Sequence, residues 1–176
     1  PPWDADFTFF GGLYRDVVLL RTADVCISPL DHAAAGVRII TDQVSRDAAS
    51  FCVEVTVDAR EPADVRLRTS VLDACGAIVA ETAVDQTLAT GSQVLRHAYR
   101  LSSPRLWHGR RDPHLYALRA SLLRDGNVID EVVERFGLRS IEIDPNRGFL
   151  LNGEPYPLRG VNKHQDRQDK GWAIAP

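Results

Sequence analysis

Residues 147–172 read RGFLLNGEPYPLRGVNKHQDRQDKGW, and at the centre of this stretch the pair Asn152-Gly153 stands between two apolar runs. An Asn-Gly pair in that setting predicts a tight β-hairpin, because both residues of the favoured two-residue turn take a positive φ. We expect the hairpin to end at Leu158. Residues 158–162 then form a short apolar run that stops in the polar cluster 163–166, as a strand does when its end opens onto a site.

The order of motifs in this stretch resembles a known junction. The series FLLNGEP, LRGVNKHQD and KGW is similar to the place where glycoside hydrolases of family 2, above all the β-galactosidases, pass from an immunoglobulin-like domain into their catalytic barrel. Upstream, WHGRRDPHLY at residues 107–116 resembles the family's W-x-P-x-x-P-x-L-Y without its first proline, and residues 136–142 resemble F-G-x-R-x-I-E. GGLYRDV at residues 11–17 resembles the last strand of the N-terminal sugar-binding jelly roll. The resemblance is weakest between residues 22 and 103.

This resemblance implies three substrate-contact residues. In similar β-galactosidases and β-glucuronidases an aspartate nine residues before the arginine of GGLYRDV helps to bind the terminal sugar, which assigns that role to Asp6. The asparagine and histidine of the family's G-V-N-R-H motif correspond to Asn162 and His164, with Lys163 in place of the usual arginine. Barrel sites lie at the C-terminal ends of strands, which agrees with this position. A solvated Asp6 and an exposed His164 are the simpler alternatives.

Length and composition limit what the chain can be. Its 176 residues contain no methionine and begin at Pro1, which predicts an internal fragment. An eight-stranded α/β barrel takes roughly 250 residues, so we expect one domain with extensions. The net charge of −3 comes from 21 basic and 24 acidic residues without a basic stripe, which argues against a nucleic-acid partner. No apolar run approaches the roughly 20 residues of a membrane span.

The three cysteines are odd in number and have no CxxC spacing, which argues against a zinc site and a disulfide framework. His108 and His114 flank a turn rich in arginine, and neighbouring positive charge disfavours a metal there. We therefore expect no metal and no cofactor. We interpret His32 and His97 as ordinary loop and strand residues.

Between residues 23 and 137 the apolar residues alternate with period two and show no helical stripe, which predicts an all-β sandwich. About seven short strands are typical of an immunoglobulin-like fold. The most apolar run, Leu115–Leu123, is predicted to be central, and it joins the next strand through a hairpin turn at residues 124–127. The other predicted strands lie at residues 25–28 and 37–40 (one broken strand), 51–57, 65–71, 77–84, 94–101 and 128–138. The residues predicted to face the core are Phe51, Val53, Val55, Val57, Val65, Leu67, Thr69 and Val71.

A further strand is predicted at Leu13–Leu20, after Gly11-Gly12. A lone strand cannot bury itself, so it needs a neighbour to pair with.

The chemistry of glycoside hydrolysis requires two carboxyl groups, which are roughly 5 Å apart in a retaining enzyme. Acidic residues of the predicted sandwich point outward or lie in turns, so none suggests such a pair. The resemblance places both catalytic glutamates in later barrel strands, beyond residue 176. We therefore expect no hydrolysis by this chain alone.

These observations predict a structural segment of a family 2 glycosidase. Its expected parts are the end of a jelly roll (residues 1–21), an immunoglobulin-like sandwich (22–140), and a linker hairpin with the first strand of an incomplete TIM barrel (141–176). The expected partners are the jelly roll and barrel of the same chain, the carbohydrate substrate and, in the family, often a second copy. GVNKHQD favours terminal β-galactosides. The alternatives are a β-glucuronidase or β-mannosidase fragment, or an autonomous carbohydrate-binding module, which would need an exposed aromatic platform. The cellular location is not indicated.

Overall fold

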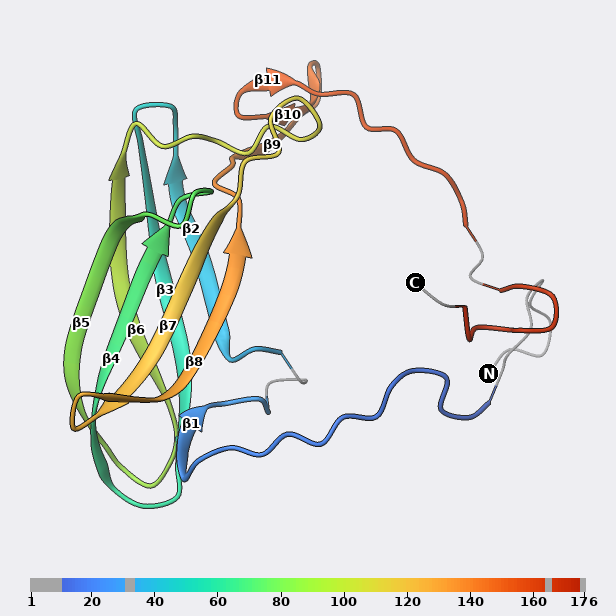
Figure 1. Cartoon of the computed structure of the whole chain (residues 1–176). Helices are drawn as coiled ribbons and strands as arrows, with labels where there is room; N and C mark the ends of the chain where they lie inside the picture. The colour runs from blue at the N-terminus through green and yellow to red at the C-terminus, as the bar shows by residue number, and fades with distance from the viewer. Residues whose placement is uncertain (1–10, 31–33, 164–165, 175–176) are drawn as a thin grey trace. The chain divides into compact units, whose positions relative to one another are not determined.

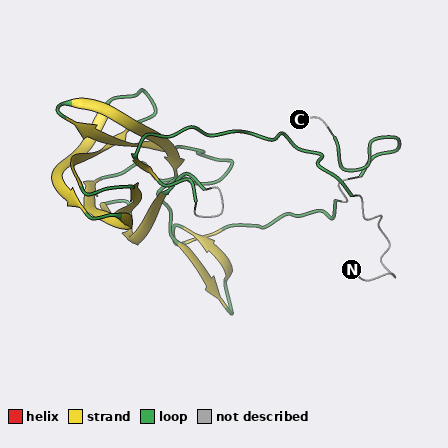
Figure 2. Ribbon diagram, turned by 90° about the horizontal axis from the view of Figure 1, so that it is seen from below, coloured by secondary structure: helices red, strands yellow, loops and turns green. Residues whose placement is uncertain are grey.

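The period-two runs form antiparallel strands in the computed structural model, which describes residues 11–30, 34–163 and 166–174 (Figure 1). No helix occurs among these residues (Figure 2), which confirms the all-β prediction. Two compact units can be distinguished, Thr22–Tyr156 and a smaller one formed by Pro1–Arg21 with Pro157–Pro176. The larger unit contains all the strands.

Two facing sheets make up most of this unit, and a small third sheet follows them in sequence (Figure 1). In one sheet β3 pairs with β6 along one edge and with β1 and β2 along the other, and the second sheet has the order β5-β4-β7-β8. The pairings β3 with β6 and β4 with β7 join strands that are not consecutive, which is consistent with an immunoglobulin-like sandwich. The strands are β1 (Val25–Ile27), β2 (Val37–Val44), β3 (Ala48–Ala59), β4 (Ala63–Leu72), β5 (Ile78–Leu88), β6 (Gly91–Ser102), β7 (Tyr116–Arg124) and β8 (Asn127–Phe136).

The predicted broken strand is confirmed, because β1 and β2 lie end to end along one edge of β3. Val25 to Ile27 pair with Ala59 to Val57, and Val37 continues opposite Val55. Two hydrogen bonds bridge the break, from Ser28 N to Thr56 O at 2.8 Å and from Thr56 N to Gly36 O at 2.8 Å. The loop between the two halves therefore leaves the ladder almost uninterrupted.

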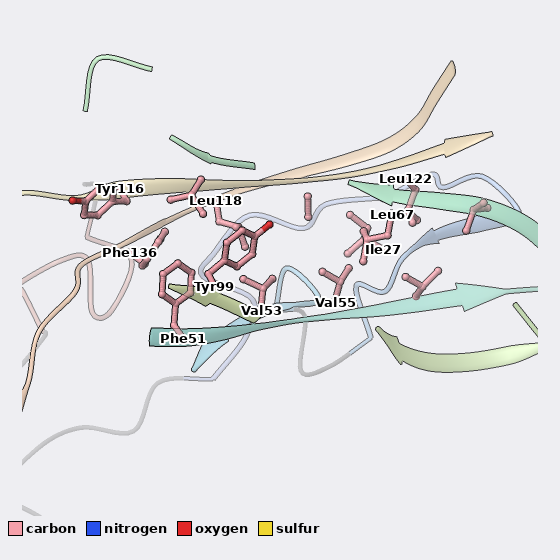
Figure 3. Close-up of a cluster of buried hydrophobic side chains, with 14 of the residues drawn as sticks. Ile27, Phe51, Val53, Val55, Leu67, Tyr99, Tyr116, Leu118, Leu122 and Phe136 are labelled. Carbon is pink, nitrogen blue, oxygen red and sulfur yellow. The ribbon is translucent and has the colours of Figure 1, made fainter. Parts of the chain in front are cut away.

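The core lies between the two sheets, where side chains of β3 and β6 meet those of β4, β7 and β8 (Figure 3). Every residue predicted to face the core is buried. At one end of the core Phe51 stacks on Tyr99 with ring centroids 5.3 Å apart, and it packs against Phe136 at 5.4 Å. The disulfide of antibody domains has no counterpart here, since all three cysteines are free. Apolar packing therefore holds the sheets together, along with buried hydrogen bonds between Thr69 of β4 and the His97 and Tyr99 side chains of β6.

The predicted hairpins are confirmed at both turns. Asp125 and Gly126 have φ values of 51° and 79° and connect β7 to β8, and Asn152 and Gly153 have 54° and 78°. The second turn joins the short strands of the third sheet, which has the order β11-β10-β9. These strands are β9 (Ile141–Asp144), β10 (Gly148–Leu151) and β11 (Glu154–Pro155).

Two strand predictions are wrong. Leu13–Leu20 and residues 158–162 form no strand in the described part of the chain, and the hairpin ends at Pro155 rather than at Leu158. Both segments are largely exposed; Leu19, for example, is 96% accessible and Val161 91%. Both segments carry apolar residues that are common in strands, but a strand forms only where a neighbouring strand accepts its backbone hydrogen bonds.

Candidate functional site

Of the three predicted substrate contacts, only Asn162 belongs to the described residues. It is exposed, in the segment after the third sheet. Asp6 and His164 lie outside the described residues. Their convergence on one pocket therefore stays a prediction.

The smaller unit brings together the described neighbours of these positions. Arg15 Nη1 donates to the backbone oxygen of Trp172 at 3.1 Å, and the Tyr14 and Trp172 rings meet edge to face at 5.6 Å. These contacts join the GGLYRDV motif to the KGW motif across 157 positions of sequence. A cavity of about 620 Å³ lies beside them, lined by Gly11, Tyr14, Asp166, Arg167, Gln168, Asp169, Lys170, Gly171, Trp172 and Ala173.

The turn at Asn152 is a densely hydrogen-bonded polar site of the larger unit. Its backbone N donates to Ser140 O at 2.9 Å, and its side-chain oxygen accepts from Ser140 N at 2.9 Å. Its side-chain nitrogen donates to Trp107 O at 3.0 Å and lies 3.1 Å from His108 Nδ1. One residue thus ties the hairpin to the start of β9 and to the WHGRRDPHLY loop.

The side chain next to this turn, Glu154, accepts hydrogen bonds from two arginines and lies close to His108. Arg46 Nη2 lies 2.6 Å from Oε1, and Arg111 Nη1 and His108 Nε2 lie 3.4 and 3.5 Å from Oε2. Arg46 comes from the β2–β3 turn, 108 residues away in sequence. A cavity of about 330 Å³ opens here, lined by Arg46, Pro104, Leu106, His108, Arg111, Asp112, Asn152 and Glu154. Sequence reasoning missed this cluster, because no local motif links the β2–β3 turn to the hairpin.

Tyr156, the last residue of the larger unit, lies against the same loop. Its hydroxyl accepts from Arg110 N at 3.2 Å, the Arg111 guanidinium lies 5.8 Å from its ring centre, and the His108 ring meets it edge to face at 6.1 Å. Gly109 packs directly on this ring and has a φ of +59°, which no proline can adopt. The stretch in which the family's first proline is missing has therefore become a close-packed glycine turn.

The rest of the WHGRRDPHLY loop is fixed by local pairs. Arg105 donates twice to Asp112, at 2.9 and 3.0 Å, and lowers the pKa of that carboxyl. His114 packs edge to face on Tyr116 at 4.7 Å. His108 and His114 thus have different partners, and among the described residues no group of three or more His, Cys, Asp or Glu side chains could hold a metal.

The carboxyl groups with displaced pKa values are all displaced downward. Arg66 lowers the pKa of Asp85, Arg105 that of Asp112, and the backbone amides of Arg147 and Asn146 that of Asp144. A general acid at neutral pH needs the opposite displacement. None of these three carboxyl groups suits that role.

One histidine is buried in the core. His97 Nδ1 lies 2.7 Å from Thr69 Oγ1, which in turn lies 2.5 Å from the Tyr99 hydroxyl. In the described structure His97 Nε2 is buried without a hydrogen-bond partner, and burial lowers the pKa of His97.

Acidification should therefore destabilise the sandwich through His97. As the pH falls below about 6.5, the ordinary pKa of histidine, the unfolded chain binds a proton that the folded chain excludes, so this contribution to stability is lost. Urea denaturation between pH 7.5 and 5.5 measures it, with His97→Gln as the non-titrating comparison. The wild type should lose more free energy of unfolding than the variant over this range, and equal losses would contradict the prediction.

No helix among the described residues is long and apolar enough to cross a membrane.

Comparisons with known proteins agree along the whole chain. A model of Glycosyl hydrolases family 2 matches residues 33–139. A β-glucuronidase of Bacteroides fragilis is 41% identical over 99% of this chain and 25% of its own length, and a β-galactosidase of Thermoanaerobacter pseudethanolicus is 26% identical over 96% and 21%. The crystal structure of a Bacteroides uniformis β-glucuronidase superposes with a TM-score of 0.91 at 31% identity, covering 99% of this chain and 21% of that one.

The chain thus spans a quarter or less of the length of these proteins. The family model matches well over half of it, including the sandwich from the first loop to the end of β8. Together with the two-sheet fold and the hairpin after it, this shows that the chain belongs to glycosyl hydrolase family 2.

Proposed function

We propose that this chain is a non-catalytic scaffold segment of a retaining β-glycosidase. In this proposal residues 1–21 end a sugar-binding jelly roll, residues 22–140 form the immunoglobulin-like domain, and residues 141–176 lead into the catalytic TIM barrel. The observation that supports it is the turn at Asn152, just before the chain continues to Asn162. Two of its polar contacts continue the β9–β10 pairing at Ser140, and two reach the sandwich loop at Trp107 and His108. A sandwich whose C-terminal hairpin is fixed in this way is suited to holding neighbouring domains in place.

The substrate pocket of the whole enzyme would include Asp6, Asn162 and His164. The asparagine and histidine would donate hydrogen bonds to sugar hydroxyls that strengthen in the transition state. The partners of the segment are then the jelly roll and barrel of its own chain, with a second subunit as a further partner.

Two sugars are candidates for the terminal residue of the substrate. The motif GVNKHQD favours a β-galactoside, whereas the relative that is 41% identical is named a β-glucuronidase. The similarity to this relative extends over 99% of the chain, whereas the other argument rests on one motif. We therefore place the β-glucuronide first and the β-galactoside second.

Hydrolysis of nitrophenyl β-glucuronide, β-galactoside and β-mannoside tests the proposal, measured with this chain and with the full-length protein. We expect activity from the full-length protein alone, and the preferred substrate names the sugar. Activity of this chain by itself would contradict the scaffold role. Inactivity of both would favour the carbohydrate-binding alternative, which a sugar titration of this chain then decides.

A further inference from the structure

The cluster around Glu154 is wholly contained in the larger unit, yet it secures that unit's last residues. We define the Glu154 clamp as Arg46, His108, Arg111, Glu154 and Tyr156. Three segments meet in it, namely the β2–β3 turn, the WHGRRDPHLY loop and the hairpin strand β11. From Tyr156 the chain runs six residues further to Asn162.

We infer that Glu154 is a positioning residue: its clamp fixes the point from which the chain continues to the predicted substrate contacts Asn162 and His164. This inference rests on the proposed function. It assigns a role in the reaction to residues that touch neither substrate nor catalytic carboxylates.

The Asn152 contacts hold the turn of the hairpin, but its last strand has few contacts of its own. The two-residue strand β11 is paired with β10 only at Leu150–Pro155 and Leu151–Glu154. One backbone bond, from Tyr156 N to Phe149 O at 2.9 Å, extends this pairing. A short hairpin is marginal by itself, so contacts of Glu154 and Tyr156 with the sandwich decide how firmly its last residue is held.

The charges make Glu154 the residue on which the clamp depends. Both arginines point at the same carboxylate from different segments, and the other carboxylate nearby, Asp112, is taken up by its two bonds to Arg105. Loss of the Glu154 charge would leave Arg46 and Arg111 facing each other without an anion between them. The two segments would then repel each other across the cavity instead of closing on β11.

The exposure of the clamp's arginine side chains distinguishes a role in positioning the hairpin from a role in the global stability of the sandwich. The side chains of Arg46 and Arg111 are 78% and 59% accessible, so solvent screens their ion pairs and little stability depends on them. The clamp should therefore affect the local opening of the hairpin far more than the unfolding of the sandwich. This distinction makes the inference testable.

Amide hydrogen exchange of this chain is the first test. In Glu154→Ala the amides of Asn152 and Tyr156 should exchange faster than in the wild type, by about tenfold or more, while amides of β3 stay protected. Glu154→Gln should give an intermediate rate. The control is Asp85→Asn, which removes another exposed arginine pair, Arg66–Asp85 at 2.7 Å. This pair joins β4 to β5 in the second sheet and takes no part in the Glu154 clamp. Unchanged exchange at Asn152 and Tyr156 in Glu154→Ala would overturn the inference.

Kinetics of the full-length protein are the second test. Misplacement of substrate contacts that act in the transition state lowers kcat more than it raises KM, so in Glu154→Ala we expect kcat to fall about fivefold or more with KM within about twofold. Asp85→Asn should match the wild type in both constants. Faster exchange with unchanged kcat would refute the positioning role.

The two tests also separate this inference from the proposed function. A wild-type full-length protein that hydrolyses none of the three glycosides refutes the proposed function and, with it, any positioning role in that reaction. The exchange rates still decide in that case whether the Glu154 clamp holds the hairpin.

Discussion

Replacing Gly36 with alanine is expected to lower the free energy of unfolding by about 3 kcal/mol. Gly36 has a φ of +71°, and a Cβ built there would collide with the backbone oxygen of Ser28 and lie 2.9 Å from Ile27 Cγ2. The collision involves backbone, so the loop must shift. That shift would disturb the hydrogen bonds from Ser28 N to Thr56 O and from Thr56 N to Gly36 O, which keep the broken strand on the edge of β3.

Gly76→Ala is the matched control for this substitution. Gly76 has a similar φ of +85°, but a Cβ there meets nothing within 4 Å. Gly76→Ala should lower the free energy of unfolding only by the conformational cost of placing alanine in the left-handed region, about 1–2 kcal/mol. Urea denaturation of both variants separates strain from collision. Equal losses of unfolding free energy in the two variants would contradict the prediction, because the chain would then relieve the close contact at position 36 without an energetic cost.

Phe51→Ala is expected to destabilise the sandwich by about 4 kcal/mol. The Phe51 side chain is only 3% accessible and contacts Tyr99 of β6 and Phe136 of β8, so it joins the two sheets at one end of the core (Figure 3). Removal of the ring leaves a cavity between the two sheets. The hydrogen-bonded ladders keep each sheet stiff, so the sheets cannot fully close this cavity. Thermal unfolding should show a fall in Tm of about 8 °C or more.

Phe51→Leu and Val133→Ala are the controls for this cavity. Leucine refills much of the space and should cost less than about 2 kcal/mol. Val133 is half exposed on β8, so its truncation should change stability by less than about 1 kcal/mol. If Phe51→Ala behaved like Val133→Ala, apolar packing of this ring could not be what holds the sheets together in place of a disulfide.

The strands of the sandwich could be predicted because the alternation of apolar residues that specifies them is local in the sequence. In Phe51 to Val57 every second residue is apolar, and the structure buries those residues against the other sheet. Hairpin turns are equally local, since Asp125-Gly126 and Asn152-Gly153 carry the positive φ that their turn requires. By contrast, the end of β2 at residues 41–44 escaped prediction because its first three residues are polar and exposed and its pairing is set by β3 alone.

The residues of the candidate site also divide into those that local sequence indicated and those that only the folded structure revealed. Motif spacing pointed to Asp6, Asn162 and His164, and this assignment stays a proposal. No spacing could have identified Glu154, because its partner Arg46 lies 108 residues away and becomes a neighbour only when the β2–β3 turn and the hairpin meet at one end of the sandwich.

The amino-acid sequence by itself therefore determined the all-β class, the two-residue turns, the core-facing residues and the resemblance to family 2, because alternation and turn chemistry act over a few residues. Only the tertiary structure decided which apolar runs become strands and which charges meet. Leu13–Leu20 is mostly apolar, yet it forms no strand, because a strand needs backbone partners that its own sequence cannot supply. The Glu154 clamp depends in the same way on segments that the folded sandwich alone brings within reach of one carboxylate.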